Sequence, residues 1–445
     1  MRHSRHRACD DFHRTAAAIT RRQLVGRSLA AGVTAYVAAN TPLERIFEAA
    51  EAAAADAPAA PVLVSVFLPG GCDLLSTLVP LAQYGRLNDL RRPLVAGDAP
   101  PLSGTTDFAT HPGLSSGLNG GIAGLYANNR IGFLPGIDYA NPDLSHFHSR
   151  HFWESGLITQ RPSPGWLGRW LDHHGAPDNP LQAVSLDGGL SPVLRGAIAP
   201  AAAISDPGNA RLGISGTFGT GAEKALAAWD ALAAQPASVQ PGPLAAGVSA
   251  HLTKSVADRL APYQTSKGVP ASELRPRVQY PADSHFATAL SALAGLIDLP
   301  LGLRLASVDA PSDFDTHDSQ PSELGAALEE VSAGLAAFQA DLEARGSADR
   351  VLTFVWSEFG RRPEANRSLG SDHGAGGIAW VQGTRALAGV LTGYPDLNAL
   401  DGEGNLAVTV DFRSIYASLL EQWLGTDADE VIPSSAAFGR VRLVR

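Results

Sequence analysis

The sequence predicts an α/β fold with a largely parallel central sheet, and a strand–helix–strand unit in its second half is the clearest indication. LGLRLASVD (301–309) and VLTFVW (351–356) are short apolar runs, typical of strands buried on both faces of a sheet. Between them, apolar residues recur in steps of four and three over 322–345, and Gly346 then ends the predicted helix. A crossover of this kind joins two parallel strands.

Length and composition allow a large core. The chain has 445 residues, 45% of them hydrophobic, so it can bury an extensive interior as one large domain or two ordinary ones. Its first predicted core strand begins at Val62, where VLVSVFL is ended by Pro-Gly-Gly. The net charge of −10, with no cluster of Lys and Arg outside the N-terminus, argues against a nucleic-acid-binding protein.

The middle of the chain, about 185–275, is rich in Pro, Gly, Ala and Ser. Helices are expected near 222–234 and 245–260, where Ala-rich apolar patterns recur. Because no clean linker separates this region from its surroundings, we expect an insertion or cap on the same domain, with a second compact domain as the alternative.

Residues 1–57 are predicted to be an export signal and linker, and 58–445 the mature domain. ITRRQLVGRSLAAGVTAYVAAN places Arg21 and Arg22 ahead of a short apolar segment, as in twin-arginine signals, with processing expected near 54–61. An ordinary Ala-rich helix is the alternative. The apolar run is shorter than the roughly 20 residues that a spanning helix needs, so no transmembrane anchor is expected. We therefore expect a periplasmic or extracellular protein.

Three polar clusters follow predicted strands and are expected at one edge of the sheet. They are Asp73 after the first strand, residues 313–318 after the strand at 301–309, and Ser357 with Glu358 after the strand at 351–356. In parallel α/β proteins, ligands and catalytic residues gather where the carboxyl ends of the strands meet. The three clusters therefore predict a functional site at that edge.

The second of these clusters, DFDTHDSQ, favours a metal site. Asp315 and His317 are one residue apart, and in extended backbone such side chains point the same way, so both can bind one ion. The alternative is that Asp315 caps a turn and His317 lies on the surface, because loops are rich in such residues.

Another candidate pair, Asp372 and His373, lies between glycines in GSDHGAGG, where the backbone is free to turn both side chains inward. Upstream, Arg361 and Arg362 follow Glu358 closely. A guanidinium beside a metal ion is a good clamp for a phosphate or sulfate group. Pairing of Arg361 with a neighbouring glutamate on a solvated loop is the alternative.

The segment NPDLSHFHSRHFWESG (141–156) offers a hydroxyl nucleophile. Ser145, followed by a helical run, would lie at a helix N-terminus, where the dipole favours an anionic substrate. The same residue can equally serve as an ordinary N-cap. Of His146, His148 and His151, one is expected near a site and the others packed or on the surface.

Six motifs in order resemble the bacterial exported family called domain of unknown function 1501. They are FLPGGCDLLSTLVP, SHFHSRHFWESG, GWLGRWLD, FDTHDSQ, SEFGRRPEAN and SDHGAGG, and they cover nearly the whole mature chain. This family is similar to the alkaline phosphatase and sulfatase superfamily of metal-dependent hydrolases and transferases. The resemblance implies an alkaline phosphatase-like three-layer sandwich with a largely parallel sheet and an inserted cap region.

The superfamily's order of site residues implies roles in this chain. Asp73, Asp315, His317, Glu358 and His373 would be metal ligands, Ser145 the nucleophile, and Arg361 a stand-in for a second ion on the leaving side. Because Phe359 stands where a histidine is expected after Glu358, a two-ion site is reduced to one ion on this alignment. An alternative alignment makes Asp372 and His373 the acid–histidine pair and leaves Glu358 outside the ligand set.

The resemblance thus implies an exported hydrolase of a small phosphate or sulfate ester that uses one or two divalent ions. Mixed carboxylate and imidazole ligands suit Zn²⁺ or Mn²⁺, whereas Ca²⁺ or Mg²⁺ would fit a site without histidine ligands. The alternative is an exported binding or assembly protein that keeps the fold without the chemistry, which the missing histidine favours.

Overall fold

The structure, a computed structural model, describes residues 33–36, 60–210, 227, 241–311 and 313–445. The predicted export motif at Arg21 and Arg22 lies outside these residues, as does the helix expected at 222–234 apart from residue 227. Among the described helices, none combines the length and the apolar character that crossing a membrane requires.

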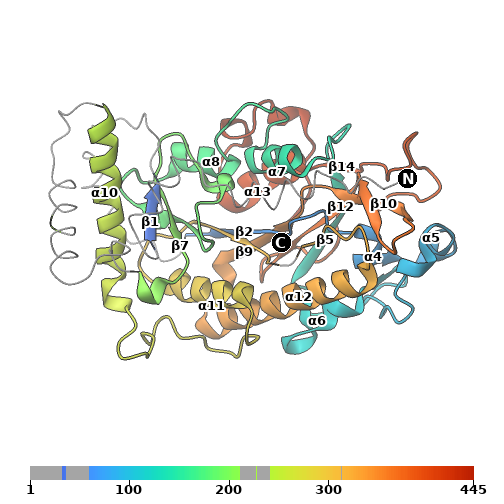
Figure 1. Cartoon of the computed structure of the whole chain (residues 1–445), viewed down its shortest axis with the longest axis horizontal. Helices are drawn as coiled ribbons and strands as arrows, with labels where there is room; N and C mark the ends of the chain where they lie inside the picture. The colour runs from blue at the N-terminus through green and yellow to red at the C-terminus, as the bar shows by residue number, and fades with distance from the viewer. Residues whose placement is uncertain (1–32, 37–59, 211–226, 228–240, 312) are drawn as a thin grey trace, which may run out of the picture.

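A ten-stranded mixed sheet forms the middle layer of the described structure (Figure 1). Its strands lie in the order β1 (Val33–Tyr36), β7 (Ala201–Ile204), β6 (Ala183–Ser185), β8 (Leu305–Asp309), β2 (Val62–Phe67), β9 (Val351–Trp356), β12 (Gly377–Gln382), β5 (Ile131–Asp138) and β13 (Gly389–Val390), while β14 (Val410–Asp411) also pairs with β5. The neighbours from β7 to β9 are all parallel. β12 is antiparallel to both of its neighbours, and β1 is antiparallel to β7. The predicted α/β fold with a largely parallel sheet is confirmed.

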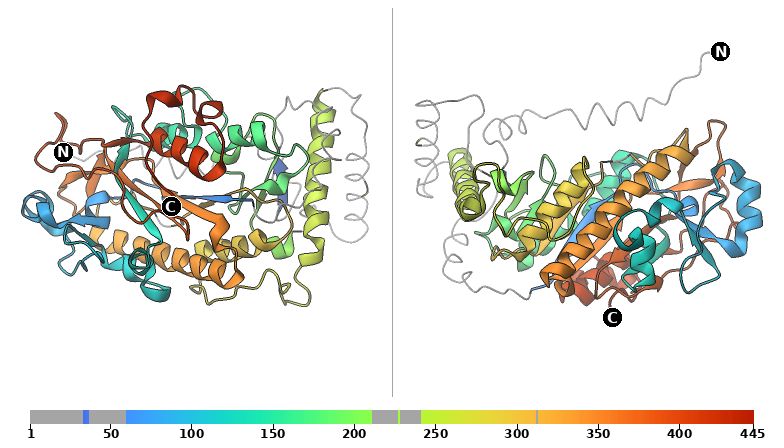
Figure 2. Two further views of the ribbon diagram at one scale, coloured as in Figure 1. Left: turned by 180° about the vertical axis from the view of Figure 1, so that it is seen from behind. Right: turned by 90° about the horizontal axis from the view of Figure 1, so that it is seen from below.

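Helices cover both faces of this sheet and complete a three-layer arrangement (Figures 1 and 2). One face carries α6 (Gly121–Ala127), α11 (His285–Asp298) and α12 (Gln320–Arg345), and the other carries α7 (His146–Ser155), α8 (Trp166–His174) and α13 (Phe412–Leu419). A further helix, α10 (Pro241–Leu260), stands beside β1 at one end of the sheet.

Each face of the sheet has its own apolar core. Along β2, Val62, Val64 and Val66 pack in the cluster that includes α11 and α12. Leu63 and Phe67 pack in the cluster that includes α7, α8 and α13. Alternate side chains of a strand point to opposite faces, so the run VLVSVF, which is apolar except for Ser65, fills both cores.

The predicted strand–helix–strand unit is confirmed, with shifted ends. β9 has the expected bounds, but β8 begins only at Leu305, because Gly302 adopts a φ of +69° that interrupts extended backbone. The connecting helix α12 begins at Gln320. β8 and β9 lie parallel on either side of β2, so the carboxyl ends of all three strands meet at one edge.

The region expected as an insertion, 185–275, also contributes to the main sheet. It supplies β7, which pairs with β6 in parallel and with β1 in antiparallel orientation. The helix expected at 245–260 is confirmed as part of α10, which begins at Pro241.

Short elements after β2 and β9 shape the carboxyl edge of the sheet. They are α4 (Leu74–Thr77), β3 (Leu78–Pro80), α5 (Tyr84–Arg91) and β4 (Phe108–Thr110) after β2, and the antiparallel hairpin of β10 (Gly360–Ala365) and β11 (Ser371–Gly374) after β9. Gly70, with a φ of +110°, lets the loop after β2 touch the loop after β8, since a Cβ there would lie 2.3 Å from the backbone nitrogen of Asp315.

Candidate metal centre

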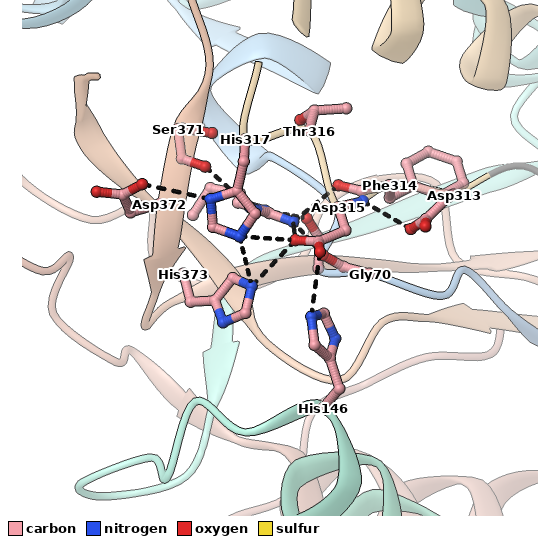
Figure 3. A network of polar contacts seen from close by, with 12 residues as sticks. Gly70, His146, Asp313, Phe314, Asp315, Thr316, His317, Ser371, Asp372 and His373 are labelled. Carbon is pink, nitrogen blue, oxygen red and sulfur yellow. Dashed lines mark hydrogen bonds and ion pairs between the residues drawn. The ribbon is translucent and has the colours of Figure 1, made fainter. Parts of the chain in front are cut away.

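Three chain segments meet at the carboxyl edge of the sheet (Figure 3). The loop after β8 supplies Asp315 and His317, and the β10–β11 hairpin supplies Asp372 and His373. The first turn of α7 supplies His146. The structure therefore brings together Asp315, His317 and His373, which the sequence predicted as ligands, and adds a third histidine to them.

The side chains converge through atoms that can bind a metal. Nε2 of His317 and Nε2 of His373 each lie 3.0 Å from Oδ1 of Asp315, and the two nitrogens lie 3.0 Å from each other. On the other oxygen of the carboxylate, Oδ2 lies 3.4 Å from Nε2 of His146. One ligand atom from each of His146, Asp315 and His373 lies within 4.8 Å of the other two.

The second ring nitrogen of each histidine faces a hydrogen-bond acceptor. Nδ1 of His146 lies 2.8 Å from Oε1 of Glu358, and Nδ1 of His373 lies 2.9 Å from the carbonyl oxygen of Leu144. Nδ1 of His317 lies 3.3 Å from Oδ1 of Asp372. A carbonyl or ionised carboxylate only accepts, so each Nδ1 carries a proton, and the Nε2 lone pair faces the centre whenever Nε2 itself carries no proton.

The electrostatic environment keeps Asp315 ionised. Burial raises its pKa, but hydrogen bonds from the three histidines and the charge of Arg361 hold the pKa of Asp315 well below its ordinary value. Burial lowers the pKa of His146, and its hydrogen bonds to Asp315 and Glu358 outweigh burial and raise that pKa to about 9. Burial lowers the pKa of His373.

Glu358 is buried directly behind His146. Besides His146, its carboxylate accepts the backbone N–H of Gly70, at 2.9 Å from Oε1, and that of Gly71, at 3.3 Å from Oε2. Burial raises the pKa of Glu358, but the hydrogen bond and charge of His146 bring that pKa below its ordinary value. In this arrangement Glu358 orients a ligand, as in the alternative alignment that leaves it outside the ligand set. The carboxylate of Asp372 similarly faces Nδ1 of His317, but the side chain of Asp372 is 55% exposed.

Asp73 belongs to a separate buried network. Both of its carboxylate oxygens lie 2.8 Å from Nη1 of Arg91, and the two side chains are each 1% exposed. The carboxylate also accepts from the backbone N–H of Leu75 and from the side chains of Ser76 and Gln320. These contacts occupy the oxygens of Asp73 and stabilise α4, which Asp73 caps, so the structure does not bring Asp73 into the histidine cluster.

Arg361 is buried beneath the cluster. It pairs with His373 across the hairpin, and its Nη2 lies 2.5 Å from Oδ1 of Asp315. Its other hydrogen bonds go to backbone carbonyls of four residues: Gly70, Gly71, Phe314 and Ser371. The guanidinium thus ties the loops after β2 and β8 to the hairpin and fixes the orientation of Asp315.

Ser145 lies beside the cluster at the N-cap of α7, half-buried, and its side chain makes no capping hydrogen bond. The residue before it, Leu144, has a φ of +58°, an uncommon conformation for a bulky side chain. That backbone turn presents the carbonyl of Leu144 to His373. Local strain of this kind is typical of functional sites, where the surrounding structure enforces it.

His146 is the ligand candidate that sequence reasoning did not single out. One histidine of 146, 148 and 151 was expected near the site, and His146 is the one that faces Asp315. Nδ1 of His148 instead lies 2.9 Å from Asp143, and Nε2 of His151 lies 2.9 Å from the carbonyl of Arg161. No local sequence signal distinguishes His146, because His285 stands at the same position after the N-cap of α11 and is exposed.

Comparisons with known proteins give a family match over part of the chain and a distant structural similarity. A sulfatase from Pseudoalteromonas sp., PsFucS1, has a similar structure, with a TM-score of 0.34 and 11% sequence identity over 91% of this chain and 77% of that one. No curated protein matches the sequence. Residues 260–436 match the model of the family described as "Protein of unknown function (DUF1501)", a range that includes α12 and the hairpin. The family resemblance found in the sequence motifs is therefore confirmed over this part of the chain.

Proposed function

We propose that the chain is an exported, metal-dependent hydrolase of small phosphate or sulfate esters. The observation that carries the proposal is the convergence of three Nε2 atoms on Asp315 while an acceptor faces each Nδ1. Histidines that bind metals characteristically donate their second ring N–H to a carboxylate or a carbonyl, which fixes the tautomer and the orientation of the ring.

The spacing of the ligand atoms suits one divalent ion. Two ligands with bonds of about 2.1 Å to one ion lie about 3.0 to 3.4 Å apart in octahedral or tetrahedral coordination. The separations of 3.0 and 3.4 Å around Asp315 fall in this range. With Nδ1 protonated, the Nε2 lone pair of neutral His373 faces a carboxylate oxygen, and either a proton or a metal ion between these two acceptors would remove their repulsion.

The donor set favours Zn²⁺ or Mn²⁺ as the ion. Imidazole nitrogens are good ligands for transition metals, whereas Ca²⁺ and Mg²⁺ prefer oxygen ligands. A catalytic zinc ion typically keeps three protein ligands and one open position. His146, Asp315 and His373 would supply such a set, with His317 next to it.

A divalent ion held here would act as a Lewis acid toward the ester and lower the pKa of the attacking hydroxyl or water. Glu358 and the carbonyl of Leu144 orient the rings of His146 and His373, and Arg361 orients Asp315. We assign Ser145 as the nucleophile because its hydroxyl does not cap α7. It also lies between Leu144, whose carbonyl contacts His373, and His146, which contacts Asp315.

Export and partner class follow from the sequence alone. The twin-arginine motif at Arg21 and Arg22 supports a periplasmic or extracellular location. The net charge of −10 argues against a nucleic-acid partner, while a small-molecule ester as the substrate rests on the proposed chemistry of the metal centre.

A second candidate function is an exported metal-binding protein without ester chemistry. The contacts of Arg361 favour it, because this guanidinium is 1% exposed and donates to backbone carbonyls and Asp315. The guanidinium of Arg361 therefore has few N–H donors left to bind the leaving group of an ester, the role expected for it from the sequence.

The test is the metal content of protein purified without chelator, measured by inductively coupled plasma mass spectrometry. We expect about one equivalent of Zn or Mn in the wild type and its loss in Asp315→Ala. Asp318→Ala, which removes an exposed carboxylate from the same loop, is the matched control and should keep the metal.

The metal-loaded protein is then assayed with aryl phosphate and aryl sulfate esters. Hydrolysis by the wild type and Asp318→Ala, with none by Asp315→Ala, would support the enzyme. Bound metal without hydrolysis of either ester class would favour the second candidate. If the wild type holds no stoichiometric metal even after incubation with Zn²⁺ or Mn²⁺, both functions are excluded.

A further inference from the structure

A pocket of about 610 Å³ lies away from the metal centre and is lined by four arginines: Arg350, Arg385, Arg442 and Arg445. We call it the arginine pocket. Trp423 and Val444 add apolar surface to its wall. The volume falls in the range of small-molecule sites, about 300 to 1,000 Å³.

The four guanidinium groups have no carboxylate partner among the ion pairs of the described residues. Arg350 donates to the carbonyls of Ala60 and Ile297, and Arg445 to those of Ala386 and Asn129. By contrast, Arg440 in the same C-terminal segment forms an ion pair with Glu421. Within the described part of the chain, the arginine pocket thus keeps guanidinium groups that form no ion pair with a carboxylate.

The charge of the arginine pocket opposes that of the whole chain. Four guanidinium groups line it, against one acidic side chain, that of Asp349. The protein as a whole carries a net charge of −10. A concave cluster of one sign concentrates counter-ions, because its field lines are focused by the surrounding protein.

The arginine pocket lies at the opposite edge of the sheet from the metal centre. Pro61 directly precedes β2 and Arg350 directly precedes β9, whereas the metal centre is built on loops that leave the carboxyl ends of strands beside them. A strand of six residues spans about 20 Å, so one small ligand cannot contact both places.

We propose that the arginine pocket binds a small polyanion, a molecule with two or more phosphate, sulfate or carboxylate groups. The guanidinium fork presents paired N–H donors that match the oxygens of these groups, and arginine remains charged at any physiological pH. Arg350 and Arg445 already donate to backbone carbonyls, so Arg385 and Arg442 are the principal forks for a ligand, and two forks match a ligand with more than one anionic group. This site is independent of the proposed ester hydrolysis.

The experiment is isothermal titration calorimetry with pyrophosphate as the probe, on the wild type and on the double variant Arg385→Ala/Arg442→Ala. Both side chains are exposed, and neither donates a hydrogen bond to another structural element among the described residues, so the variant should fold. We expect the affinity to fall by about tenfold or more for each arginine removed, as for other charge-assisted hydrogen bonds.

Two controls separate this site from other causes of binding. Arg195→Ala removes an exposed arginine elsewhere and should bind pyrophosphate like the wild type. Asp315→Ala alters the metal centre and should also bind normally. Equal affinity in the double variant and in Arg195→Ala would overturn the proposal, as would binding that survives the double variant but is lost in Asp315→Ala, which would place the anion at the metal centre.

Discussion

Nδ1 of His146 lies 2.8 Å from Oε1 of Glu358, although 212 residues separate the two in the chain. The carboxylate of Glu358 is itself fixed by backbone N–H groups of the loop after β2. The orientation of His146 toward Asp315 therefore depends on Glu358, a residue that does not face the centre.

Glu358→Gln should weaken metal binding without abolishing it. The amide cannot supply the same charged acceptor to Nδ1 of His146, and loss of such a partner typically lowers metal affinity by about 10- to 100-fold. Competition with a chromophoric chelator measures the affinity. Glu364→Gln, an exposed change in the same hairpin, should have no effect. An unchanged affinity in Glu358→Gln would show that this contact does not orient the ligand.

His146→Ala and His148→Ala should behave differently, although the two residues are two positions apart in α7. Only His146 faces Asp315, whereas Nδ1 of His148 pairs with Asp143. We expect His146→Ala to lose stoichiometric metal and His148→Ala to retain it, measured by inductively coupled plasma mass spectrometry. Equal metal content in both variants would exclude His146 from the ligand set.

Arg91→Ala should destabilise the fold strongly. It would leave the carboxylate of Asp73 buried without its cationic partner, and breaking a buried ion pair typically costs about 3 to 5 kcal/mol. Urea denaturation followed by circular dichroism measures the free energy of unfolding. Arg92→Ala, at the next position but exposed, should change it by less than about 0.5 kcal/mol. Similar stability of the two variants would contradict the structural role given to the Asp73–Arg91 pair.

Asp138 should make the protein less stable as the pH rises. Burial raises the pKa of this carboxyl to about 8, and the backbone N–H groups of Tyr139 and Gly376 offset burial only in part. Between about pH 4 and pH 8 the folded state therefore holds a proton that the unfolded state has released. The free energy of unfolding falls across this window, by at most about 1.4 kcal/mol per pH unit from this group.

The test compares the free energy of unfolding of the wild type and Asp138→Asn from pH 5 to pH 8. The variant will be less stable overall, because an amide nitrogen cannot accept the hydrogen bond that one carboxyl oxygen accepts. Its slope with pH should nevertheless be flatter than that of the wild type. Parallel slopes would mean that Asp138 is already ionised in the folded protein.

Much of the fold could be predicted from local patterns in the sequence. β2 and β9 are continuous apolar runs because both faces of the sheet are covered, and their parallel pairing brings the polar residues after each strand to one edge. Asp315 and His317 were predicted on that basis, and His373 from its place between glycines and from the family resemblance; the three side chains lie together. The late start of β8 depends on the φ of Gly302, which no hydrophobic pattern reveals.

The remaining parts of the site depend on tertiary contacts that a sequence pattern does not encode. The tripeptide Ser-His-Phe occurs at 145–147 and again at 284–286, where Ser284 caps α11 through the N–H of Ala287. At 145–147 the serine makes no such bond, and His146 faces the centre. Likewise, the sequence allowed Asp73 to be a metal ligand, and only the fold shows that its carboxylate forms an ion pair with Arg91.

The centre is assembled from three segments of chain, which supply His146, Asp315 and His373. A partly synthesised or unfolded chain has no such arrangement, so an ion would be captured only after the sheet has closed, and its binding would then stabilise the folded state. A twin-arginine pathway transports proteins that are already folded. On the export and metal binding proposed above, the ion would be selected by the metal pool of the compartment in which the chain folds, before the protein reaches the compartment in which it works.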